Sequence, residues 1–287
     1  GVSDLSFLSN MTRLEYLDAG GNPIRDIAPL ANLTRLTYLN LSWTRISSLE
    51  PIAGLKRLNN LTLGTTRVSD LKPIENMILL TNLDISGTRV ASLEPLRKLN
   101  RLQNLYMGNT DVEDLSPLSS CSQLKYLYFN NTPVASLDAL SNCSQLEYLD
   151  CSYTDVRDLS PLRSVTYLRN LMCNNTLVDS LEALKDLIVL DYLSFNDSNV
   201  KSLKGLEEME NLKSVNFSNT KVSDLTPLVK LEGLENIYAS SSFISSIKPL
   251  INHPGLRNLS IYNCLVPKSE MQKFRAENPD CYLDGDY

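Results

Sequence analysis

Apolar residues recur along this chain with a period of 22 residues that does not slip. When one recurring leucine is counted as position 0, positions 3, 5 and 10 are apolar in every copy, and positions 13 and 16 are Leu or Ile through Leu250. The position-0 leucines are Leu14, Leu36, Leu58, Leu80, Leu102, Leu124, Leu146, Leu168, Leu190, Leu212, Leu234 and Leu256. Positions 2 to 6 alternate, so each copy predicts one short strand whose positions 3 and 5 face the core.

A fixed period of this length with this leucine spacing indicates a leucine-rich repeat solenoid. We therefore predict an α/β fold, a curved right-handed superhelix with about 12 parallel strands on its concave side. On the convex side, Asp or Ser precedes segments with proline, as in SDLKPI, EDLSPL and RDLSPL. Proline and the short repeat disfavour a long helix. Since Asp and Ser side chains can bond free N–H groups, we expect 3₁₀ turns or extended backbone there.

Both ends of the array depart from the repeat. Leu5, Leu8 and Met11 match positions 13, 16 and 19 of a truncated first copy at 1–13, so we expect upstream residues or a cap to complete it. The predicted array is therefore 1–266, with 12 repeats of 22 residues.

The period breaks at the C-terminus in the stretch PKSEMQKFRAENPDCYLD, which predicts a helical cap at 267–287. Ser269 followed by Gln272 matches a capping box, so we expect a helix at about 270–277 that closes the core with Met271 and Phe274. A proline follows this helix, and 281–283 predict a final short strand.

Cysteine, histidine and threonine fit the repeat as interior residues. Of the six cysteines, four fall at apolar positions 5 and 19 of adjacent copies, where thiols behave as small hydrophobes. A disulfide between Cys264 and Cys281 is left open. His253 also falls at position 19, so we expect it in the core and predict no metal or cofactor. Position 8 is threonine in eight copies, and we expect inward hydroxyls bonded to loop backbone.

Positions 2, 4 and 6 face out of the predicted sheet and carry Tyr, Asn, Ser and Gly without any Lys or Arg. This mixture is typical of antibody-like binding surfaces, because tyrosine gives contact area with few rotors and Ser and Asn give adaptable hydrogen bonds. Aromatic residues also suit strands for structural reasons. The candidate ligand-binding residues on this concave face are Tyr106, Tyr126, Tyr128, Tyr148, Asp150, Tyr153, Met172 and Tyr192.

Two charged patterns accompany this face. Arg45, Arg67 and Arg89 occupy position 9 of adjacent copies beside Trp43, which makes a secondary candidate for an anionic partner or a solvated loop. Position 1 alternates in sign over seven copies from Lys125 to Arg257, and we interpret this ladder as structural.

Composition and spacing exclude several function classes. A net charge of −6 argues against a general nucleic-acid binder, and no apolar run approaches the roughly 18 residues of a membrane span. Concave carboxylates at position 4 recur three strands apart, about 14 Å, whereas glycosidase pairs need roughly 5–9.5 Å. With a single histidine and no GxxxxGK phosphate loop, we expect no enzyme.

The copies IAPLANLTRLTYLNLSWTRISSLEPIAGLKRL and LVKLEGLENIYASSSFISSIKPL resemble the 22-residue repeats of bacterial internalin-like leucine-rich repeat proteins. The NPDCYLD terminus is similar to the end of many bacterial members of this superfamily. The resemblance implies a cell-surface or secreted binding protein, since internalins bind host receptors through the concave face. In this chain threonine replaces the usual asparagine at position 8, and no internalin-type N-terminal cap is present.

These observations lead to one functional prediction and one alternative. We predict a non-catalytic bacterial protein, at the cell surface or secreted, that recognises a protein or glycan on its concave Tyr/Asn-rich face. A lipid anchor upstream of residue 1 is left open. The many N-x-S/T segments favour a bacterial or intracellular setting over eukaryotic secretion. The alternative is a cytoplasmic scaffold or regulatory subunit, similar to the phosphatase regulators that also use 22-residue repeats.

Overall fold

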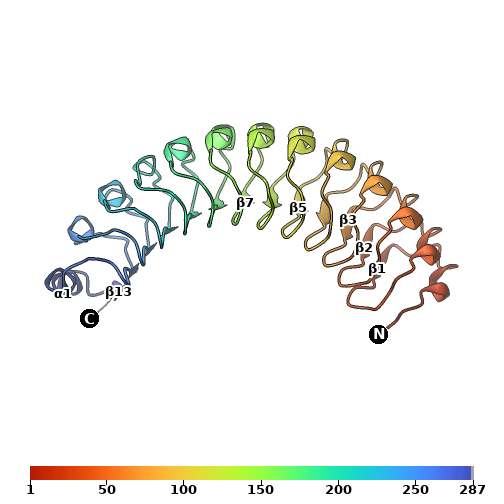
Figure 1. The fold of residues 1–287 in the computed structure, drawn as a ribbon, viewed down its shortest axis with the longest axis horizontal. Helices are drawn as coiled ribbons and strands as arrows, with labels where there is room; N and C mark the ends of the chain where they lie inside the picture. Colours follow the sequence, from red (N-terminus) through yellow and green to blue (C-terminus); the bar gives the residue numbers. More distant parts are fainter. Residues whose placement is uncertain (286–287) are drawn as a thin grey trace. The chain divides into compact units, whose positions relative to one another are not determined.

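The computed structural model describes residues 1–285; the last two residues of the predicted cap, 286–287, lie outside the described residues. The chain forms two compact units, Gly1–Leu146 and Glu147–Tyr287. Within each unit the strands line one side and the 3₁₀ turns line the other (Figure 1). The predicted leucine-rich repeat solenoid, with one parallel strand for each of the twelve leucine copies, is confirmed in both units.

The first unit contains six parallel strands in chain order. They are β1 (Tyr16–Asp18), β2 (Tyr38–Asn40), β3 (Asn60–Thr62), β4 (Asn82–Asp84), β5 (Asn104–Tyr106) and β6 (Tyr126–Tyr128). Its 3₁₀ turns are η1 (Ser6–Leu8), η2 (Ala28–Leu30), η3 (Glu50–Ile52), η4 (Lys72–Ile74), η5 (Glu94–Leu96), η6 (Ser116–Ser120) and η7 (Asp138–Asn142). Equal positions of neighbouring copies lie opposite each other, as Tyr16 does with Tyr38.

The second unit repeats this arrangement and adds the C-terminal elements. Its strands are β7 (Tyr148–Asp150), β8 (Asn170–Met172), β9 (Tyr192–Ser194), β10 (Ser214–Asn216), β11 (Asn236–Tyr238), β12 (Asn258–Ser260) and β13 (Tyr282–Asp284), all parallel and in chain order. Its 3₁₀ turns are η8 (Ser160–Ser164), η9 (Glu182–Leu184), η10 (Thr226–Leu228) and η11 (Lys248–Leu250), and its one α-helix in the described residues is α1 (Lys268–Glu277).

The 22-residue register stacks identical side chains into a continuous core in each unit. The middle residue of each strand points inward, and Leu149 and Leu171 are fully buried opposite each other. Position 5 adds larger side chains, and the rings of Phe195 and Phe217 stack with their centroids 5.8 Å apart. Because each buried leucine contributes roughly 1.5–3 kcal/mol, this regular core stabilises strands that are only three residues long.

The 3₁₀ turns form where the sequence predicted them, and the Asp and Ser residues before them cap their backbone. The Lys72 amide donates to the Asp70 carboxylate at 2.7 Å, and the Glu94 amide to the Ser92 hydroxyl at 3.3 Å. One copy has no 3₁₀ turn at this point, because Gly205 takes the place of proline with φ +103°. A Cβ on Gly205 would lie 2.6 Å from the Leu181 carbonyl oxygen, so only glycine fits there.

The threonines of position 8 are buried as predicted. The Thr44 hydroxyl donates to the Leu41 carbonyl at 2.6 Å, and Thr110 makes the same bond to Met107 at 2.7 Å. These hydroxyls therefore satisfy carbonyl groups of their own loops. Among the described residues the Thr66 hydroxyl has no such partner.

The C-terminal cap confirms the predicted helix and final strand but not the capping box. Helix α1 begins after Pro267, which takes an extended conformation at the N-cap and provides no side-chain bond, so Ser269 lies inside the first turn. A different side chain of the helix makes the contact with the repeat. Glu270 is buried and accepts bonds from the Ser246 hydroxyl at 2.7 Å and the Ile247 and Lys248 amides at 2.5 and 3.0 Å. The helix is thereby fixed to the start of η11, while Phe274 is fully buried.

The four cysteines at positions 5 and 19 and His253 are buried, as predicted, whereas Cys264 is half-buried. All six cysteines are free thiols, and burial raises the pKa of Cys121 to about 11 and of Cys143 to about 12. The disulfide left open between Cys264 and Cys281 is not formed, and the Cys264 sulfur lies 3.2 Å from the Ala239 carbonyl oxygen instead. Burial lowers the pKa of His253, so its ring is neutral near pH 7.

Candidate ligand-binding face

The outer residues of the strands form what we call the strand face, made of positions 2, 4 and 6. In the first unit, Tyr106 and Tyr128 lie opposite each other on β5 and β6 with their rings stacked, at a centroid distance of 4.8 Å and an angle of 21°. Tyr126 lies beside them and is 36% exposed. Burial and the neighbouring Asp84 raise the pKa of Tyr106, so this phenol stays neutral and can donate a hydrogen bond.

In the second unit, three of the predicted residues come together on β7 and β8. The Tyr148 hydroxyl lies 3.8 Å from the Met172 sulfur, and Met172 is the register partner of Asp150. The Asp150 carboxylate accepts a bond from the Ser152 amide at 3.0 Å. Tyr192 lies one strand further, on β9, and is half-buried. The predicted binding residues therefore divide into a first-unit group of Tyr106, Tyr126 and Tyr128 and a second-unit group of the other five.

Much of the remaining strand face is occupied with its own hydrogen bonds. The Asn40 amide donates to Asp18 at 2.8 Å, and the Thr62 hydroxyl donates to Asn40 at 2.7 Å. In the second unit, Asn258 bonds Asn236 at 2.6 Å. These amide ladders link equal positions of neighbouring copies, so part of the Tyr/Asn pattern stabilises the sheet itself.

A left-handed turn follows each of the strands β1 to β12, and the sequence pattern did not reveal it. Position 7 has a positive φ in each of the twelve copies. Most copies place Gly, Asn or Asp there, as the left-handed region favours. Trp43 (φ 59°) and Tyr153 (φ 59°) are the aromatic exceptions, and they are 71% and 60% exposed. Large exposed side chains held in an unfavourable conformation are typical of functional positions, which supports Tyr153 as a candidate and strengthens Trp43.

A further group of exposed apolar side chains was missed by the sequence reasoning. It lies at the C-terminal end of the second unit and consists of Tyr238, Phe243, Tyr262, Leu265 and Tyr282, all at least 40% exposed. Phe243 and Leu265 share position 9 of adjacent copies. Two apolar residues in succession at this solvent-facing position were the available signal.

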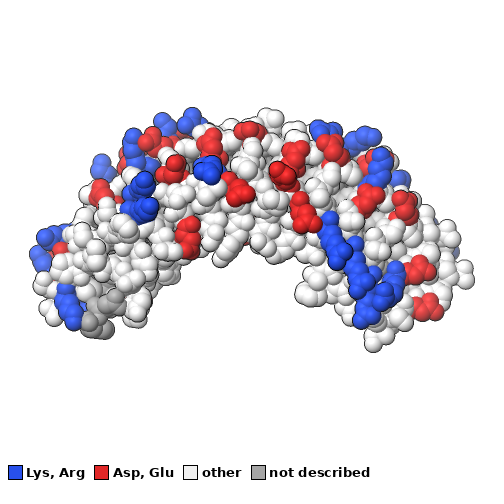
Figure 2. Space-filling model, in the orientation of Figure 1, with Lys and Arg blue, Asp and Glu red and all other residues white. Residues whose placement is uncertain are grey.

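The structure places the two charged patterns, the arginines of position 9 and the alternating charges of position 1, in different settings. Arg45, Arg67 and Arg89 are exposed in adjacent copies, as predicted, and Figure 2 shows a run of basic side chains in the part of the view that holds the first unit. Of the position-1 ladder, the described contacts of the second unit include the Arg257–Glu235 pair at 4.0 Å, which is exposed and worth little.

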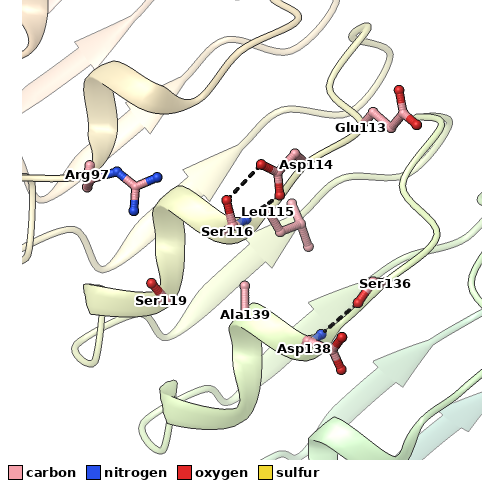
Figure 3. A pocket seen from close by; sticks show the side chains of 9 residues that line it. All are labelled: Arg97, Glu113, Asp114, Leu115, Ser116, Ser119, Ser136, Asp138 and Ala139. Atoms are coloured by element: carbon pink, nitrogen blue, oxygen red, sulfur yellow. Dashed lines mark hydrogen bonds between the residues drawn. The ribbon is translucent and has the colours of Figure 1, made fainter.

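The hollow between η6 and η7 on the turn side of the first unit is built by capping residues (Figure 3). Asp114 accepts bonds from the Ser116 amide and hydroxyl, both at 2.7 Å, and Ser136 accepts the Asp138 amide at 3.1 Å. A similar hollow recurs between η8 and η9. Since its polar groups already serve the turns, we interpret this hollow as a consequence of the repeat.

No helix within 1–285 is long and apolar enough to cross a bilayer. In the same residues, no group of three or more His, Cys, Asp and Glu side chains is placed to hold a metal ion.

Comparison with known proteins places the chain among leucine-rich repeat proteins. A family model described as "Leucine Rich repeats (2 copies)" matches residues 78–120, 100–142 and 122–164. No curated protein matches the sequence. A leucine-rich repeat protein from Leptospira interrogans has the same fold, with 16% identity, a TM-score of 0.87 and coverage of 98% of this chain and 81% of that one.

Two internalins from Listeria monocytogenes are similar in sequence as well. Internalin C2 is 25% identical, with a TM-score of 0.64 and coverage of 66% of this chain and 83% of its own. The internalin InlF is 30% identical, with a TM-score of 0.86 and coverage of 88% and 76%. Proteins of this kind are typically non-catalytic and bind other proteins. The repeat, the cap and this similarity together show that the chain belongs to the internalin family of leucine-rich repeat proteins.

Proposed function

We propose that this protein is a non-catalytic binding protein of a bacterium, displayed at the cell surface or secreted, which recognises a protein ligand through tyrosines of its strand face. The stacked pair of Tyr106 and Tyr128 with the partly exposed Tyr126 beside it carries the proposal. Stacking restricts the rings before any ligand arrives, so binding costs little side-chain entropy. The family supports a protein ligand, and the internalin relatives support display or secretion.

The second-unit group offers a different chemistry to the same kind of ligand. Met172 supplies an adaptable apolar surface, Asp150 supplies a carboxylate, and Tyr153 projects from its turn with 60% of its surface exposed. Such a combination of aromatic anchors and adaptable polar groups is typical of binding surfaces that distinguish one protein from another.

The test is a screen of the purified chain against host-protein and glycan arrays, with two alanine variants. One variant replaces Tyr106, Tyr126 and Tyr128, and the other replaces Tyr148, Tyr153 and Met172. A matched control replaces Ile78, Tyr167 and Ile188, which are at least 55% exposed but lie away from positions 2 to 7. We expect a protein ligand whose affinity falls at least tenfold in a strand-face variant and is unchanged in the control.

Three outcomes would contradict the proposal. Equal loss of binding in the control would show that the strand face is not the site. Hits restricted to glycans would replace the protein ligand with a carbohydrate. Recovery of the native protein from the cytoplasmic fraction of its source cell would favour the scaffold alternative.

A further inference from the structure

Three arginines of the first unit form a row that the backbone holds in register. The Arg67 amide donates to the carbonyl of Ile46, the residue after Arg45, at 2.9 Å. The Arg89 amide donates in the same way to Val68, the residue after Arg67, at 3.0 Å. Successive arginines therefore follow each other at the spacing of neighbouring strands, about 4.8 Å. We call Trp43, Arg45, Arg67 and Arg89 the basic rim.

The row lacks neutralising partners within the protein. Among the described residues, none of the three guanidinium groups lies within 4.0 Å of a carboxylate. Position 9 does not require arginine, because the copies on either side place Pro23 and Asp111 there. Like charges at this spacing repel one another, and this row occurs in a chain whose net charge is −6.

Trp43 adds a second unfavourable feature at the same place. It lies two residues before Arg45, has a φ of 59° and is 71% exposed. Gly21 in the preceding copy and Gly87 two copies later adopt the positive φ of this turn without strain, whereas Thr65 in the copy between shares the unfavourable conformation. A strained aromatic residue beside a row of repelling cations breaks two local rules at once, and natural chains retain such combinations at functional sites.

The side chains of the basic rim favour a ligand with carboxylates and an apolar group. A guanidinium binds a carboxylate through two parallel hydrogen bonds, and the indole ring offers a flat apolar surface. Two strand spacings give a row of roughly 10 Å, about three residues of extended chain, in which alternate side chains lie about 6.7 Å apart on one face. A nucleic acid would need a longer track of cations for stable binding.

We infer that the basic rim binds a short, extended, acidic segment of the protein ligand, in which two alternate carboxylates lie along the row of Arg45, Arg67 and Arg89 while an apolar side chain packs on Trp43. This inference rests on the proposed binding function and names the chemistry of one part of the ligand. It also gives that part a steering role, because complementary charge raises association rates at low salt.

The test measures fluorescence anisotropy of the full chain with a fluorescein-labelled peptide of alternating Glu and Ser residues and one central Leu. One variant changes Arg45, Arg67 and Arg89 to Gln. The matched control changes Arg35, Arg57 and Arg101 to Gln, three exposed arginines of the same unit, so that the net charge changes equally. We expect binding to weaken at least tenfold in the rim variant and less than twofold in the control, with a shallower salt dependence in the rim variant.

Several results would overturn the inference. These are an absence of peptide binding by the wild type, equal losses in both arginine variants, or equal binding of a peptide with Gln in place of Glu. Tighter, rim-dependent binding of a heparin oligosaccharide would assign the rim to an anionic glycan instead.

Trp43→Asn separates a binding role from a structural one. Because Asn suits the left-handed turn, we expect the melting temperature to stay close to that of the wild type while peptide affinity falls about fivefold. A large drop in melting temperature with unchanged affinity would show that Trp43 is structural. The alanine variant of Tyr106, Tyr126 and Tyr128 should still bind the peptide, so a failure of the rim and a failure of the strand face are distinguishable.

Discussion

Residue 153 offers a direct measurement of the strain in the left-handed turns. Its φ of 59° places any side chain with a Cβ in a region that glycine and asparagine tolerate best. Tyr153→Ala, Tyr153→Asn and Tyr153→Gly all remove the aromatic ring, so the loss of its contacts is common to the three variants. Differences among them therefore report the backbone conformation.

The magnitude follows from the cost of the left-handed conformation for an L-residue, about 1–2 kcal/mol. Glycine removes this cost, and the several-fold enrichment of asparagine in this region corresponds to about 1 kcal/mol. We expect Tyr153→Gly and Tyr153→Asn to be more stable than Tyr153→Ala by about 1 kcal/mol each. This order is the reverse of the usual one, in which glycine is less stable than alanine by roughly 0.5–1 kcal/mol.

The assay is guanidinium unfolding followed by circular dichroism, with m-values compared so that midpoint shifts report stability. Lys185 supplies the control, because it is exposed in the same unit with φ −53° and ψ −28°. There, Lys185→Gly should be less stable than Lys185→Ala. If Tyr153→Ala is as stable as the Asn and Gly variants, the strain argument for both Tyr153 and Trp43 is wrong.

Three further predictions test the core, the cap and the binding face. Leu149→Ala should lower the free energy of unfolding by about 2–5 kcal/mol. A loss under about 0.5 kcal/mol would contradict the full burial of Leu149. Glu270→Ala leaves the donors of Ser246, Ile247 and Lys248 without their carboxylate, and should cost about 1–3 kcal/mol by thermal unfolding. Burial alone would raise the pKa of Glu270, but these hydrogen bonds and the charge of Lys248 hold that pKa below its usual value. The contribution of Glu270 to stability is therefore present above its unfolded pKa, about 4.3, and is lost as pH falls through the lower folded pKa. If Glu270→Gln leaves the acid unfolding titration unchanged, this reasoning is wrong. Tyr128→Ala should weaken ligand binding in the array assay while thermal unfolding stays within a few degrees of wild type, and severe unfolding would show a structural role.

The candidate site could be predicted only in part from the sequence. The period assigned Tyr106 and Tyr128 to the same face of neighbouring strands, and the structure brings their rings into contact. The amide bonds between Asn236 and Asn258 could not be deduced, because the pattern gives the position of a side chain and not its partner. The apolar group that includes Phe243 was missed, since exposure depends on what packs beside a residue.

The sequence by itself determined the repeat, the inward and outward positions and the capped turns, because a 22-residue register forces equal positions into the same environment in every copy. Only the tertiary structure shows where equal positions of the repeat differ in their contacts or conformation. Helix α1 begins at Lys268, and Glu270 bonds the preceding turn although the local sequence favoured Ser269 as a cap. The turns after each strand adopt positive φ whatever residue they carry, so Trp43 and Tyr153 are held there by the hydrogen bonds of neighbouring copies and against their own preference. Local propensity is worth about 1 kcal/mol at such a position, and the cooperative stacking of copies exceeds it.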